Sequence, residues 1–112
     1  MAKILLAEDD AHTIRVMQLW LTRHKHVVLE SNNGREALDR LRSMSVDLLI
    51  SDVNMPVMGG LELVRAVRRE LGLSVPILMF SSRCDHADLA DQVRDLSVHL
   101  YPKPFVPSKL CQ

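Results

Sequence analysis

Several polar residues that could bind a metal ion or a phosphoryl group stand at or just beyond the ends of short apolar runs of the chain. Acidic residues follow the first run (Glu8, Asp9) and the third (Asp52), a serine follows the fourth (Ser81) and a lysine follows the fifth (Lys103). Carboxylates held close together repel and need a compensating cation, and hard oxygen ligands without a Cys/His cluster suit Mg²⁺. An aspartate carboxylate can act as a nucleophile towards phosphorus, while a hydroxyl and an ammonium group can bind phosphoryl oxygens. These residue types suit phosphoryl chemistry, provided that the fold brings them together.

The apolar runs indicate buried parallel strands. They carry Ile, Leu and Val at consecutive positions, as strands covered on both faces do, and they span residues 4–7, 27–29, 48–50, 76–80 and 98–101. Between the runs, apolar residues recur at helical spacing: Ile14, Met17, Leu21; Ala37, Leu38, Leu41; Leu61, Val64, Val67; Leu89, Val93, Leu96. Turn dipeptides precede two of these helices, at Asn33-Gly34 and Gly59-Gly60. The order predicts an α/β fold with an open, doubly wound parallel sheet, in which ligands bind at the carboxyl ends of the strands.

Length, charge and cysteine content narrow the class of protein. The 112 residues suffice for one domain, and 14 basic residues balance 14 acidic ones. A net charge of zero gives no electrostatic basis for binding nucleic acid, and no apolar segment is long enough to span a membrane. The two cysteines lack CxxC spacing, which fits a reducing compartment, so a cytoplasmic location is expected.

The chain resembles receiver domains of bacterial response regulators in five segments: ILLAEDD, NNGREAL, DLLISDVNMPVMGGLEL, VPILMFSS and YPKPF. The resemblance covers nearly the whole chain, so residues 1–112 are expected to form one receiver (phosphoacceptor) domain. It implies a flavodoxin-like, doubly wound sheet of five parallel strands in the order 2-1-3-4-5, as in the chemotaxis regulator. Only seven residues follow Phe105, so the last helix is expected to be short or truncated.

The resemblance also implies a magnesium site at the phosphoacceptor. Asp52 corresponds to the residue that accepts the phosphoryl group. Asp9 would bind Mg²⁺ directly and Glu8 would bind it through water. Asp52 itself and the backbone carbonyl of Asn54 would complete the protein's ligands.

Two further residues and the partners follow from the same resemblance. Ser81 would bind the phosphoryl group and Lys103 would pair with it. A sensor histidine kinase or a histidine phosphotransfer protein would supply that group, and a downstream effector protein or domain would respond. The domain alone would bind neither nucleic acid nor membrane and would be a monomer or weak homodimer. It would catalyse at most its own phosphorylation and dephosphorylation, and so would not be a conventional enzyme.

Other functions would require different features in the sequence. Leu100 stands where the family often has an aromatic switch residue, and with the short tail it leaves open the alternative of a receiver-like interaction module that never carries phosphate. A phosphatase with an aspartate nucleophile would usually carry a second Asp two residues later, where this chain has Asn54, which cannot transfer a proton usefully. Neither GxGxxG nor GxxxxGK[ST] occurs, which argues against nucleotide binding.

Some residues have a structural interpretation instead. Asp10 is predicted to cap the first helix, and acidic residues at a helix start are favoured by the helix dipole in any case. Arg68 and Arg69 are predicted to lie on a solvated helix face. Leu96 stands where many receivers carry glycine, so the turn into the last strand is expected to differ.

Overall fold

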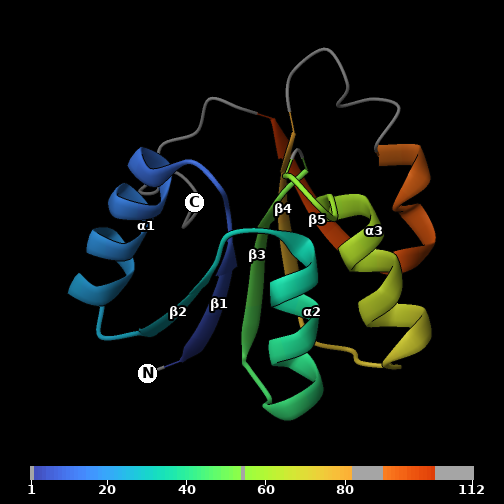
Figure 1. Cartoon of the computed structure of the whole chain (residues 1–112), viewed down its shortest axis with the longest axis horizontal. Coiled ribbons are helices and arrows are strands. Elements are labelled where there is room, and N and C mark those ends of the chain that lie inside the picture. The colour runs from blue at the N-terminus through green and yellow to red at the C-terminus, as the bar shows by residue number, and fades with distance from the viewer. Residues whose placement is uncertain (1, 54, 82–89, 103–112) are drawn as a thin grey trace.

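The computed structural model describes residues 2–53, 55–81 and 90–102. Within these ranges the elements are β1 (Lys3–Ala7), α1 (Ala11–Arg23), β2 (Val27–Ser31), α2 (Gly34–Ser43), β3 (Leu48–Asp52), α3 (Gly60–Arg65), a π-helical segment (Ala66–Glu70), β4 (Ile77–Ser81), a 3₁₀ turn (Arg94–Leu96) and β5 (Val98–Pro102). The five strands pair in parallel in the order β2-β1-β3-β4-β5 (Figure 1). The predicted sheet and its strand order are confirmed.

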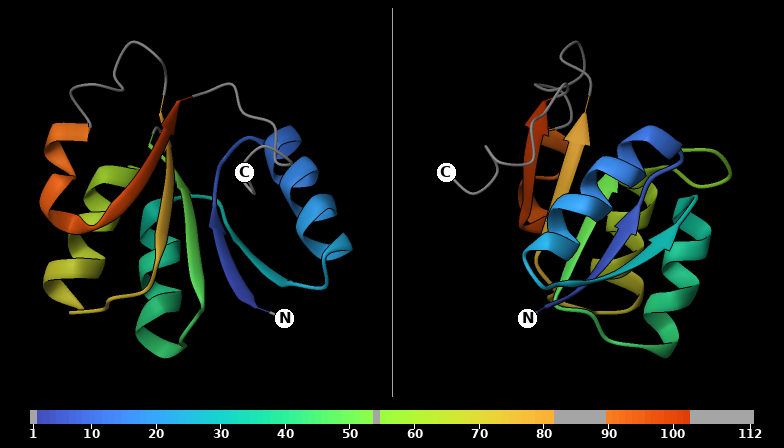
Figure 2. Two further views of the ribbon diagram at one scale, coloured as in Figure 1. Left: turned by 180° about the vertical axis from the view of Figure 1, so that it is seen from behind. Right: turned by 90° about the vertical axis from the view of Figure 1, so that its left-hand side faces the viewer.

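The two faces of the sheet are covered by two apolar clusters. Figure 2 shows α1 on one side of the sheet and α2 and α3 on the other. The α1 side buries Met17 and Leu21 against alternate strand residues: Ile4, Leu6, Ile50 and Phe80. The other side is larger and buries helix residues such as Leu38, Leu41, Leu63 and Val64 against Leu5, Ala7, Leu49, Ile77 and Met79. Because successive strand residues point to opposite faces, consecutive apolar runs are needed to serve both clusters.

Helices α1 and α2 begin at capping residues. The Asp10 carboxylate accepts a hydrogen bond from the Thr13 backbone N–H at 3.2 Å, so the predicted cap of α1 is confirmed. The Asn33 side chain accepts from the Glu36 N–H at 2.8 Å and caps α2 in the same way. No helix in the described part of the chain combines the length and apolar character of a membrane span.

Arg68 departs from the sequence prediction. Its guanidinium donates hydrogen bonds to three backbone carbonyls: Leu96 (2.6 Å), Leu73 (2.9 Å) and Ser97 (3.2 Å). Partial burial of the group lowers the pKa of Arg68. The prediction of a solvated side chain is therefore wrong for Arg68 and right for Arg69, which is exposed and pairs with Asp95 at 3.3 Å.

The turn that leads into β5 combines a buried leucine with a serine in the left-handed conformation. Leu96 is buried in the larger cluster, and the next residue, Ser97, adopts the left-handed conformation with φ of 57°. The left-handed position thus lies at Ser97, where the carbonyl is bound by Arg68. Leu96 serves as a core residue there.

Candidate functional site

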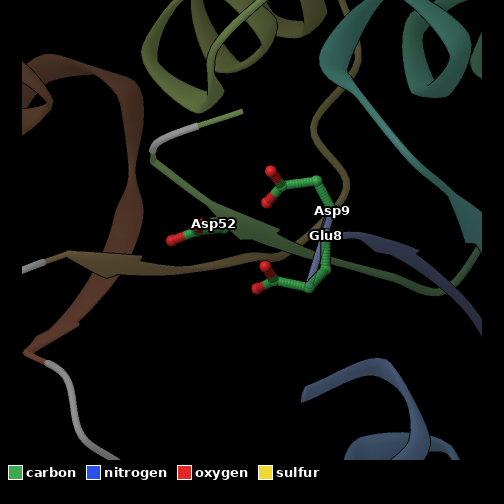
Figure 3. A group of neighbouring side chains, drawn as sticks. All are labelled: Glu8, Asp9 and Asp52. Atoms are coloured by element: carbon green, nitrogen blue, oxygen red, sulfur yellow. The ribbon is translucent and has the colours of Figure 1, made fainter. Parts of the chain in front are cut away.

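Three carboxylates meet at the carboxyl edge of the sheet (Figure 3). Glu8 and Asp9 directly follow β1, and Asp52 is the last residue of β3. The two strands are parallel neighbours, with Ala7 opposite Ser51, so their ends lie side by side. One oxygen from each of the three carboxylates lies within 4.8 Å of the others. The predicted acidic group is therefore assembled by two strands that are far apart in the sequence.

The three acids differ in their exposure to solvent. Glu8 is 2% exposed and Asp52 is 4% exposed, whereas Asp9 is exposed. The Glu8 carboxylate is oriented by the Asp10 backbone N–H, which donates to its Oε1 at 3.1 Å. Burial of charged carboxylates beside one another is unfavourable unless a cation compensates them. The chemistry of this donor set, hard oxygens at one edge, fits a divalent cation such as Mg²⁺.

Hydrogen bonds of the sheet continue past the strand ends and hold the backbone of the site. The Glu8 N–H donates to the Ser31 carbonyl at 3.0 Å, and the Val53 N–H donates to the Phe80 carbonyl at 3.0 Å. Each of the two buried acids therefore lies beside a backbone hydrogen bond to a neighbouring strand. The site is built on the hydrogen-bonded end of the sheet, which favours a fixed arrangement of its carboxylates.

Asp10 is not one of the three clustered acids. Hydrogen bonds from the Thr13 side chain and backbone hold the pKa of the Asp10 carboxyl below its usual value. The charge of Asp10 is thus stabilised at the start of α1, as the capping interpretation requires.

The remaining predicted site residues are only partly described. Ser81 is the last residue of β4, and its backbone stands opposite Pro102 at the end of β5. Both strands thus end at the edge that carries the acidic group. Asn54 and Lys103 lie outside the described residues. Their predicted roles stay predictions, as does that of the Ser81 side chain.

Leu100, at the position where the resemblance implies an aromatic residue, is partly buried. Leu100 lies in β5 opposite Met79 and packs, partly buried, against the larger apolar cluster. Leu100 therefore contributes apolar packing on the α3 side of the sheet.

Two glycines beside the site, Gly34 and Gly60, belong to the two turn dipeptides of the sequence. A β-carbon at Gly60 would lie 2.1 Å from the Asp52 carbonyl oxygen, and one at Gly34 would lie 2.5 Å from the Met58 carbonyl oxygen. Neither position has room for a side chain. The dipeptides predict turns at these positions. They do not predict the close contacts, because those contacts join residues from different elements.

The comparisons with known proteins agree with one another. A family model described as "Response regulator receiver domain" matches residues 4–112. The chain is similar to the chemotaxis protein CheY homolog of Campylobacter jejuni, with 37% identity over 111 residues that cover 96% of this chain and 85% of the relative. It is 28% identical over 108 residues to the transcriptional regulatory protein ResD of Bacillus subtilis, covering 96% of this chain and 44% of that protein. The solved structure of chemotaxis protein CheY4 of Vibrio cholerae matches with a TM-score of 0.88 and 33% identity, over 99% of this chain and 93% of the other.

Proposed function

The chain belongs to the response regulator receiver domain family, and we propose that Asp52 is its phosphoacceptor. Receiver domains are phosphoacceptor switches of phosphorelay signalling, not conventional enzymes. The observation that carries the proposal is the buried Asp52 carboxylate at the end of β3, close to those of Glu8 and Asp9. The family match over residues 4–112 supports a single receiver domain spanning residues 1–112.

The acidic group is the proposed magnesium site. Asp9 and Asp52 would bind the ion directly, and Glu8, whose carboxylate is fixed by the Asp10 N–H, would bind it through water. The backbone carbonyl of Asn54 is the remaining expected ligand. When bound, Mg²⁺ would neutralise negative charge as the phosphoryl group approaches the carboxylates.

The proposed reaction is an in-line transfer to a carboxylate oxygen of Asp52. A new bond forms between that oxygen and phosphorus while the P–N bond of a donor phosphohistidine breaks. The bond electrons go to the histidine nitrogen, and the imidazole leaves as a neutral ring because its other nitrogen already carries a proton. The product is an acyl phosphate on Asp52. Water later attacks the phosphorus, which regenerates the carboxylate and releases inorganic phosphate. The protein's contribution to both steps is positioning and charge compensation, so this is self-catalysed modification.

The switch would respond to the charge added at Asp52. The Ser81 hydroxyl and the Lys103 ammonium group would contact the phosphoryl oxygens, because a hydroxyl and an ammonium group both donate to such oxygens. A shift of the segments that follow β3 and β4 would then alter the surface seen by an effector. Histidine kinases or histidine phosphotransfer proteins and downstream effectors are the expected partners, with the domain acting as a monomer or weak homodimer.

The test is the intact mass of the protein after incubation with acetyl phosphate and Mg²⁺. We expect a single phosphoryl adduct on the wild type, stable in acid and labile in base. The adduct should be absent from Asp52→Asn and from the wild type treated with EDTA. Asp39→Asn, which removes an exposed acid on α2, is the matched control and should be phosphorylated like the wild type.

The alternative is the receiver-like interaction module that never carries phosphate. No observation on the described residues favours it over the phosphoacceptor. A folded wild type that gains no adduct with acetyl phosphate or with a phosphorylated histidine donor would contradict the phosphoacceptor proposal and support this alternative.

A further inference from the structure

Three of the backbone hydrogen bonds made by the segment that joins β3 to α3 fix its shape. We call residues 53–59 the acceptor loop, since they directly follow Asp52; Asn54 lies outside the described residues. The Gly60 N–H donates to the Val53 carbonyl at 2.8 Å and closes the base of the loop. Within the loop, the Met58 N–H donates to the Pro56 carbonyl at 2.7 Å. A third bond leaves the loop, from the Gly34 N–H to the Met58 carbonyl at 2.8 Å.

The bond between Met58 and Pro56 closes a three-residue turn with Val57 at its centre. Val57 has φ of 67°, so the turn is of the rare, strained kind with a positive central φ. A β-branched residue in this region is an outlier, because its side chain crowds the backbone. The Val57 side chain is 80% exposed, so burial of that side chain does not stabilise the turn. The strained conformation must be maintained by its surroundings.

Helix α2 provides that constraint. Gly34 is the first residue of α2, and its N–H is one of the first-turn donors that have no partner inside the helix. The Met58 carbonyl accepts this hydrogen bond. A β-carbon at Gly34 would lie 2.5 Å from that oxygen and 3.0 Å from Met58 Cγ, so the helix and the loop are in direct backbone contact.

The contact lies next to the phosphoacceptor. Helices α2 and α3 both begin at the edge of the sheet where β3 ends (Figure 1). The acceptor loop starts directly after Asp52, and Gly60 at its far end is packed against the Asp52 carbonyl. A change in the loop's conformation would therefore move the backbone of Asp52, which is one of the proposed metal ligands.

We propose that Gly34 is a positioning residue for the phosphoacceptor site. Its N–H and its missing side chain form a latch that holds the acceptor loop in the strained turn at Val57. The latch thereby keeps the backbone of Asp52 in the position from which its carboxylate would bind Mg²⁺. This inference rests on the proposed function, because it assigns the loop a part in metal binding.

The experiment measures Mg²⁺ affinity by calorimetric titration without a phosphodonor, alongside the stability of each variant to denaturant. Gly34→Ala should weaken Mg²⁺ binding by about tenfold, as is typical when support for metal ligands is lost. Val57→Gly should raise stability, because glycine adopts a positive φ without strain. In the double variant Gly34→Ala/Val57→Gly, Mg²⁺ affinity should recover in part, because the relaxed loop no longer needs the latch.

Two further variants keep the test decisive. Leu21→Ala lowers stability through the opposite face of the sheet and should leave Mg²⁺ affinity unchanged. Should Gly34→Ala fail to fold, Asn33→Ala loosens the first turn of α2 by removing its cap and should weaken Mg²⁺ binding by a smaller factor.

The outcomes separate this inference from the proposed function. A wild type that binds no Mg²⁺ would contradict the proposed function. A wild type that binds Mg²⁺, with Gly34→Ala or Asn33→Ala binding it equally well, would overturn the latch alone. A Val57→Gly variant that is less stable than the wild type would show that the turn stores no strain, and would overturn the latch as well.

Discussion

The first residue of α3 is packed against the backbone of Asp52, the proposed phosphoacceptor: a β-carbon at Gly60 would lie 2.1 Å from the carbonyl oxygen of Asp52 and 3.0 Å from its carbonyl carbon. The neighbouring Gly59 has more room, since its nearest contact, the Val53 carbonyl oxygen, would be 3.1 Å from an added β-carbon. Helix α3 can start this close to β3 only because residue 60 has no side chain. The contact therefore couples the position of the helix to the position of Asp52.

This contact predicts a large effect of one added methyl group at residue 60. Gly60→Ala should lower the free energy of unfolding by about 2 kcal/mol or more, because a side chain forced against backbone must displace α3. Gly59→Ala, one residue away, is the matched control and should cost less. Urea denaturation measures both, and equal losses for the two variants would show that the Gly60 contact has no special role.

Magnesium should stabilise the folded domain through the acidic group. At a free Mg²⁺ concentration about 100 times the dissociation constant, the expected gain for the wild type is about 2.7 kcal/mol. Asp9→Asn should lose much of this gain. Without metal it should be at least as stable as the wild type, because it removes one of three clustered negative charges.

Thermal unfolding with and without MgCl₂ checks this prediction. Asp39→Asn, which removes an acid outside the cluster, should respond to Mg²⁺ like the wild type. If Asp9→Asn were stabilised by Mg²⁺ as much as the wild type is, the ion would not be bound by this group.

Arg68 should be important for stability, and its neighbour should not. Arg68→Met leaves three backbone carbonyls without their charged donor, and the expected loss is roughly 2 kcal/mol or more. Arg68→Lys should not restore the loss, because one ammonium group cannot replace the guanidinium fork. Arg69→Met removes an exposed ion pair with Asp95 and should cost less than about 1 kcal/mol. Similar denaturation midpoints for Arg68→Met and Arg69→Met would contradict this difference.

The cap of α1 should make a pH-dependent contribution to stability. The pKa of Asp10 is lowered in the folded state, chiefly by hydrogen bonds from Thr13, relative to its usual value of 3.8. A lowered folded pKa means that the contribution is fully present above pH 4 and is lost as pH falls through the folded value. Asp10→Asn keeps a capping oxygen but does not titrate.

The stability difference between the wild type and Asp10→Asn should therefore be greatest at neutral pH and shrink below about pH 4. Chemical denaturation of both proteins over this range measures it, and the other acids, which the two proteins share, largely cancel in the comparison. A difference that stays constant with pH would mean that the charge of Asp10 contributes nothing to the cap.

Much of the fold and part of the site could be predicted from the sequence. Consecutive apolar residues in the five runs predict strands buried on both faces, and helical spacing between them predicts the crossovers. Parallel strands end at one edge, so the convergence of Glu8, Asp9 and Asp52 follows from the pattern alone and is confirmed. Asp10 as a helix cap is likewise a local property of a few neighbouring residues, which is why it could be predicted.

The sequence by itself thus determined the sheet, its covering helices and the edge at which the acidic residues gather, because periodicity and strand direction are local or topological properties. The tertiary structure decided how Arg68 is used, where the left-handed turn before β5 lies, and how Gly34 meets the loop after Asp52. These features depend on contacts between backbones from separate elements, such as the bond from Arg68 to the Leu96 carbonyl, which lies 28 residues away. No pattern of residue types records which carbonyl a distant donor will face, so only the packed chain specifies them.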